Sequence, residues 1–86
     1  MSGVSRVGLD SAGGTILTGS NNVLINSAPA VRIGDVVQPH GNGEHASPVM
    51  VTGSSTVFCN GIPICKSGDV ASCGHPSTGS SNVFSN

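Results

Sequence analysis

The chain has 86 residues, enough for one small domain, and only 8% of them are charged, against about 25% in an ordinary soluble domain. Two Phe are present and Trp and Tyr are absent, which excludes a conventional aromatic core. Three basic residues and a net charge of −1 exclude a cationic surface for nucleic acid, and no apolar run reaches the roughly 18 residues of a membrane span.

Short β-branched segments bounded by Gly, Asn, Ser and Pro are the predicted elements. Helices of ten or more residues would have to cross Gly or Pro, because the longest stretch without either is 20–28. In chain order, the clearest strands are 23–25, 31–33, 49–51 and 57–59. Asn60-Gly61 follows the last of these and predicts a type I′ hairpin turn, since both residues tolerate a positive φ. The sequence therefore predicts an all-β protein.

A repeat organises these segments into three units. Thr-Gly-Ser occurs at 18–20, 52–54 and 78–80, and each copy leads through an apolar pair to Asn26, Asn60 or Asn86. The first two copies continue in register over 27–36 and 61–70. Residues 4–10 are similar to 30–35 with one residue inserted before the Asp, so the third unit is predicted to be divided between the chain ends. We expect three β units around a pseudo-threefold axis, with adjacent termini.

Six of the seven charged residues follow this repeat. The basic residues share one repeat position and the aspartates another; they are Arg6, Arg32 and Lys66, and Asp10, Asp35 and Asp69. One interpretation is a set of surface ion pairs worth about 0–1 kcal/mol each. A second, compatible interpretation is a common rim that binds a threefold partner.

Residues able to bind a metal gather in two of the three connectors between units. The first connector, 11–17, has no such side chain, whereas the second contains His40 and His45 and the third contains Cys73 and His75. If the units converge about an axis, these four side chains can meet and form a closed tetrahedral set for Zn²⁺, with Fe²⁺ as a second candidate. Four protein ligands leave no site for an activated water, so we expect a structural ion that compensates for a small core. The alternatives are loop histidines that bind nothing, and Glu44 in place of one ligand.

Cys59 and Cys65 are predicted to fill the core rather than to form a second metal pair or a disulfide. Their counterparts in the first unit are Ile25 and Val31, and free Cys often behaves as a small buried hydrophobe. Three cysteines are few for a disulfide scaffold, and the N-terminal segment shows no signal peptide, which together favour a reducing cytoplasmic compartment. No catalytic motif is evident, so we expect no enzymatic activity.

The segment Pro29-Ala30-Val31-Arg32, followed by Ile33-Gly34-Asp35, resembles the Pro-Ala-Ala-Arg motif of the PAAR-repeat proteins. A more divergent second copy is Pro63-Ile64-Cys65-Lys66, followed by Ser67-Gly68-Asp69, which keeps the Pro and a basic residue. The resemblance extends over essentially the whole chain, so residues 1–86 are expected to form a single domain.

This resemblance implies a small β cone that caps and sharpens the central spike of a contractile injection machine and helps it pierce the target cell envelope. Such machines include type VI secretion systems and the baseplates of contractile phage tails. In the family, three His and one Cys bind zinc near the sharp tip, and these correspond here to His40, His45, Cys73 and His75.

The resemblance also implies the partner and the location. The broad base would dock on a trimeric β-helix spike protein, the valine-glycine repeat protein or its phage equivalent, with one cap per trimer. Membrane contact would be transient. The protein would be cytoplasmic before assembly and then part of a phage tail or a secreted spike complex. The alternative function is a free-standing zinc-binding adaptor module.

Overall fold

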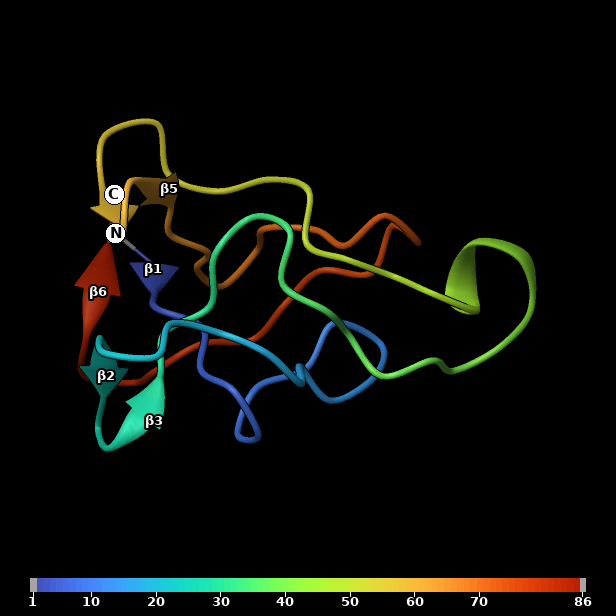
Figure 1. The fold of residues 1–86 in the computed structure, drawn as a ribbon, viewed down its shortest axis with the longest axis horizontal. Helices are drawn as coiled ribbons and strands as arrows, with labels where there is room; N and C mark the ends of the chain where they lie inside the picture. The colour runs from blue at the N-terminus through green and yellow to red at the C-terminus, as the bar shows by residue number, and fades with distance from the viewer. Residues whose placement is uncertain (1, 86) are drawn as a thin grey trace.

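Three antiparallel strand pairs form the broad end of a cone. The computed structural model describes residues 2–85 apart from the side chain of Glu44. Each strand has two residues: β1 (Ser2–Gly3) pairs with β6 (Phe84–Ser85), β2 (Leu24–Ile25) with β3 (Ala28–Pro29), and β4 (Phe58–Cys59) with β5 (Ile62–Pro63). The pairs lie together at one end of the molecule, which measures 32 × 23 × 22 Å and narrows towards the short 3₁₀ helix η1 (Gly43–His45) (Figure 1). The predicted all-β cone is confirmed.

The two chain ends complete the third unit, as predicted. Ser2 pairs with Ser85 and Gly3 with Phe84, so the terminal strands form the equivalent of the two internal hairpins. The three units are then joined in a closed ring by backbone hydrogen bonds between neighbours. Ser5 N donates to Cys65 O (3.0 Å), Cys65 N to Val31 O (2.8 Å), and Val31 N to Ser5 O (3.1 Å). Because each unit contributes one fully buried residue to this ring, the pseudo-threefold axis passes through it.

The Thr-Gly-Ser motif has the same structural roles in each unit. The threonine hydroxyl donates to the aspartate of the repeat, at 2.9 Å for Thr18 and Asp35 and at 3.0 Å for Thr52 and Asp69. The serine hydroxyl accepts backbone N–H groups two and three residues later, as Ser20 does from Asn22 and Val23. The repeat therefore preserves a set of side-chain hydrogen bonds that holds each unit together where long strands are lacking.

Type I′ geometry is confirmed at the Asn60-Gly61 turn, where φ is +54° and +77°. The first unit makes the same turn with Asn26 and Ser27, at +53° and +72°, so a serine occupies a left-handed conformation there. The equivalent Asn86 lies outside the described residues. Of the predicted strands, 31–33 and 49–51 are reduced to isolated bridges, because neighbouring residues of the chain turn towards different partners. Val49 pairs with Val36, whereas Met50 pairs with Ala71.

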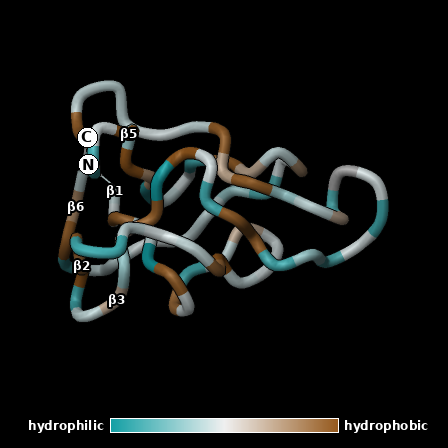
Figure 2. The backbone as a smooth tube through the Cα atoms, in the orientation of Figure 1, coloured by the Kyte–Doolittle hydropathy of each residue, from teal (hydrophilic) through white to brown (hydrophobic). Residues whose placement is uncertain are grey.

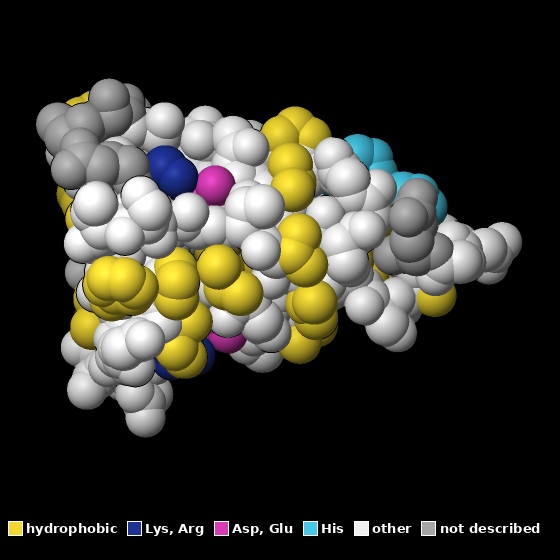
Figure 3. All heavy atoms as spheres, turned by 90° about the horizontal axis from the view of Figure 1, so that it is seen from above, with side chains coloured by type: hydrophobic (Ala, Val, Ile, Leu, Met, Phe, Trp, Pro, Cys, Tyr) yellow, Lys and Arg dark blue, Asp and Glu magenta, His cyan; other side chains and the backbone are white. Residues whose placement is uncertain are grey.

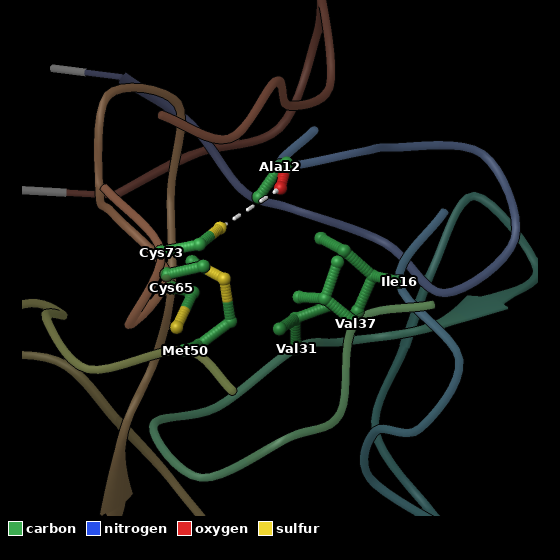
Figure 4. Close-up of a cluster of buried hydrophobic side chains, with 8 residues drawn as sticks. Ala12, Ile16, Val31, Val37, Met50, Cys65 and Cys73 are labelled. Atoms are coloured by element: carbon green, nitrogen blue, oxygen red, sulfur yellow. Dashed lines mark hydrogen bonds between the residues drawn. The ribbon is translucent and has the colours of Figure 1, made fainter. Parts of the chain in front are cut away.

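The core consists of two clusters stacked along the axis. The cluster in the middle of the cone holds branched side chains beside the sulfur atoms of Met50, Cys65 and Cys73 (Figure 4). The other, at the base, contains Cys59, and Cys59 and Cys65 are both buried and free, as predicted. Figure 2 shows why no long element forms: apolar residues occur as short stretches, each interrupted by polar ones. Single residues from many segments therefore build the core.

Candidate metal centre

The four predicted ligands lie together near the narrow end of the cone. His40 precedes η1 and His45 is its last residue, and Cys73 and His75 come from the third connector. One ligand atom from each of the four residues lies within 4.8 Å of the others. The imidazoles are visible in Figure 3 as a group on one face of the tapering end. The two connectors therefore converge as the repeat predicted.

Four of the six distances between the ligand atoms are close to the edges of a tetrahedral metal site. His40 Nε2 lies 3.1 Å from His45 Nδ1 and 3.1 Å from His75 Nδ1. Cys73 Sγ lies 3.6 Å from His40 Nε2 and 3.3 Å from His75 Nδ1. Bonds of about 2.05 Å to nitrogen and about 2.3 Å to sulfur give tetrahedral edges of about 3.3 Å and about 3.6 Å. The donor set and these four distances therefore fit a tetrahedral metal ion such as Zn²⁺.

Hydrogen bonding among the side chains does not account for this cluster. Three atoms, from His45, Cys73 and His75, surround the single His40 Nε2, which carries at most one proton. His40 Nδ1 lies 3.0 Å from the carbonyl oxygen of Gln38. An Nδ1–H donor to that oxygen leaves the Nε2 lone pair free to face a metal. The four residues thus form a group that could hold a metal ion.

The loop between the two second-connector histidines is closed by its own backbone. His40 N donates to His45 O at 3.0 Å, and within η1 the N–H of Ala46 donates to Gly43 O at 3.1 Å. Cys73 is 8% exposed, so its thiol is sheltered from solvent. The side chain of Glu44, the alternative ligand, lies outside what the structure describes. The observed geometry therefore rests on three imidazoles and one sulfur.

A comparison with known families agrees with this geometry. Residues 9–78 match the model of the PAAR motif. The chain belongs to the PAAR-motif family. No curated protein sequence matches the chain significantly. Membership supports a spike-tip role in contractile injection systems, for which the family is known as a structural component. The matched region includes all four residues of the candidate metal centre.

In this PAAR chain, Val31 replaces the second Ala of the motif and fills the axis. Its side chain is fully buried in the central cluster beside Val37 and Met50. The third-unit counterpart is Ser5, whose buried hydroxyl is satisfied by Ser77 Oγ and by Thr78 O, both at 2.7 Å. The departure from the motif is therefore accommodated by packing.

The six charged residues form three equivalent ion pairs within the units. The nitrogen–oxygen distances are 2.8 Å, 3.2 Å and 3.0 Å for Arg6–Asp10, Arg32–Asp35 and Lys66–Asp69. Each aspartate also accepts the backbone N–H of its basic partner, so each pair closes a turn. The aspartates are buried, in contrast to the surface pairs that the sequence indicated. Contact of these residues with a partner stays a prediction.

Asp10 shows the electrostatic consequence of this pairing. Burial alone would raise the pKa of its carboxyl group, but hydrogen bonds from the Arg6 side chain, the Thr78 hydroxyl and the Arg6 backbone outweigh burial and lower that pKa. The carboxylate form is therefore the one that the folded turn stabilises.

Two groups of residues near these sites were not singled out from the sequence. Gly13 and Gly14 of the first connector lie against the histidine cluster, although that connector has no ligand. Leu24, Phe58 and Phe84 are exposed at the β-hairpins of the three units. Their equivalent repeat positions could have marked the second group, because each is the outer member of an apolar pair. Among residues 2–85 the structure has no helix that could cross a bilayer.

Proposed function

We propose that this PAAR chain is the zinc-pinned tip of a contractile injection machine. It caps and sharpens a trimeric β-helical spike and helps the spike pierce the target cell envelope. The observation that supports this most is the closed ring of three units around one axis. Because a single chain presents three nearly equivalent surfaces, it can match the true threefold end of a trimer.

The base offers a suitable contact surface for such a trimer. Leu24, Phe58 and Phe84 are 59%, 57% and 51% exposed, although they are among the largest apolar side chains of the molecule. They occupy equivalent positions in β2, β4 and β6. Large exposed apolar groups at one end of a small monomer commonly mark an interaction site. Addition of the three strand pairs to the open end of a β-helix would also satisfy backbone groups that the spike otherwise exposes.

The charged turns complete this proposed contact surface. Arg6, Arg32 and Lys66 keep side-chain exposures of 19%, 21% and 19%, while their aspartate partners are buried. Figure 3 shows basic side chains close to the broad end. We include all six residues in the proposed rim, in which Asp10, Asp35 and Asp69 orient the basic groups that reach a partner.

The narrow end has a different task in this proposal. His40, His45, Cys73 and His75 would hold Zn²⁺, and the ion would supply cross-linking of the second and third connectors rather than a reactive water. In zinc-finger peptides, binding of structural zinc has an apparent free energy of about 10–16 kcal/mol at neutral pH. The ion would therefore stiffen the part of the cone that meets the envelope.

The remaining parts of the proposal follow from the mechanical role. Residues 1–86 act as one domain, with no catalytic step and no nucleic acid, and membrane contact is transient. The protein is cytoplasmic before assembly and afterwards belongs to a phage tail or a secreted spike complex.

Stoichiometry tests the proposed function. The purified chain is mixed with a trimeric β-helix spike protein, and the mass of the complex is measured by light scattering. We expect one chain per trimer. Three chains per trimer would favour the adaptor module, and the absence of a complex would refute the capping role.

A further inference from the structure

The first connector supplies no metal ligand, yet its backbone lies against the ligand atoms. Gly13 has a φ of +85°, and a Cβ at this position would collide with His75 Nδ1 and lie 2.8 Å from His40 Nε2. Both nitrogens belong to the cluster described above. A side chain at position 13 would therefore compete for space with the metal-facing atoms.

The neighbouring glycine is confined by the same residues. A Cβ on Gly14 would collide with the carbonyl oxygen of Gln38 and lie 3.1 Å from His40 Nδ1. That carbonyl is the group that His40 Nδ1 contacts at 3.0 Å, and Gln38 N donates in turn to Thr15 O at 2.8 Å. The first connector thus holds Gln38, the residue whose carbonyl group contacts the His40 ring.

Gly34 is a comparison glycine with a positive φ but no crowded neighbours. Its φ is +93°, similar to that of Gly13, but a Cβ there would have no neighbour within 4 Å. Replacing either glycine by alanine costs similar backbone strain. Only the replacement at Gly13 also meets two histidine side chains.

We propose that Gly13 is a positioning residue of the metal centre. Its missing side chain lets the first connector close over His40 and His75 and hold their ligand nitrogens in place. The inference rests on the proposed metal site. Without a metal the two histidines can rotate away from an added methyl group, so the fold loses little. Rotation removes His40 Nε2 or His75 Nδ1 from the cluster, so the added methyl group should weaken metal binding.

Cobalt binding tests this inference, because tetrahedral Co²⁺ has an intense visible absorption band that reports its coordination. The full chain, Gly13→Ala and Gly34→Ala are titrated with Co²⁺ alone. We expect the first and last to bind with equal affinity and the same band. Gly13→Ala should bind about 10–100-fold more weakly, as is typical when a group that orients a ligand is lost, and should show an altered band.

The possible failures are distinguishable. Equal affinity and an identical band for Gly13→Ala and Gly34→Ala would overturn the role of Gly13 while the metal site stands. The absence of a tetrahedral band in the unmodified chain would instead refute the metal site.

Unfolding by urea in the presence of a chelator separates positioning from general packing. The two variants should have the same midpoint without metal. A larger loss of stability for Gly13→Ala under these conditions, including failure to fold, would show that Gly13 serves the fold and would overturn the proposal.

Discussion

Replacing Phe58 by alanine tests which face of the cone meets the spike. Phe58 belongs to β4 at the broad end and is 57% exposed. It is one of three large apolar side chains at equivalent positions, the others being Leu24 and Phe84. If the base docks on a trimer, the exposed part of the Phe58 side chain becomes buried. The loss on truncation can therefore be worked out from the exposure.

A phenylalanine side chain presents about 200 Å², so an exposed share of 57% corresponds to about 110 Å² available for burial by a partner. At about 25 cal/mol per Å² this area contributes about 2.8 kcal/mol. Alanine keeps part of the contact, which leaves a loss of about 2 kcal/mol. Since 1.4 kcal/mol is a tenfold change, Kd should rise about 30-fold.

Titration calorimetry with a trimeric β-helix spike protein measures this change. Leu17→Ala is the matched control, because Leu17 is 48% exposed but lies in the first connector, outside the strand pairs. We expect its affinity for the spike to stay within threefold of the unmodified chain. An unchanged Kd for Phe58→Ala, or an equal loss for both variants, would refute docking through the base.

Three further predictions address the metal and the fold. Cys73→Ala should lower zinc content, measured by metal mass spectrometry, together with the melting temperature; unchanged zinc stoichiometry would refute the ligand assignment. Ser27→Gly should raise the free energy of unfolding by about 0.5–1 kcal/mol, because relief of left-handed strain outweighs the added chain entropy. Gly61→Ser makes the opposite change at the equivalent turn of the second unit and should lower the free energy of unfolding. Urea titrations in which both variants change this free energy in the same direction would contradict the reasoning. Burial, followed by the charges of Asp69 and Asp35, raises the pKa of Cys65 to about 12. An unfolded thiol ionises near pH 8.5, so the contribution of this thiol to stability should be constant below about pH 8.5 and fall towards pH 12. Cys65→Val, which copies Val31 of the first unit, should reduce that loss in urea titrations at pH 8 and 10, and an identical loss would contradict the assignment.

The repeat made the architecture predictable, because it fixed which residues are equivalent. Matching residues 4–10 with 30–35 led to the closure of the chain ends, which the pairing of Ser2 with Ser85 confirms. Counting the His and Cys residues in each connector predicted the grouping of His40, His45, Cys73 and His75 that the structure shows. Both inferences use sequence spacing, which needs no knowledge of side-chain direction.

Side-chain direction and backbone contact could not be predicted in the same way. A strand of two residues is too short for alternation to show which side chain points outwards, and in β4 Phe58 is exposed while Cys59 is buried. The strained Ser27 occupies a position that the repeat fills with Gly in the second unit, but sequence alone did not show that the turn geometry is retained. The contact of Gly13 with the histidines depends on the path of a segment that has no ligand.

The difference between the two ends of the cone has a physical reason. The base repeats one set of contacts three times, because a single chain must offer equivalent surfaces to a trimer if it is to cap one. Three identical connectors, each with one histidine, would give an ion three ligands and leave the fourth position open to water, as in catalytic zinc sites. Here the second and third connectors supply two candidate ligands each, and the first places Gly13 beside the histidines. Loss of threefold regularity at the tip thus brings four candidate ligands together on a threefold base.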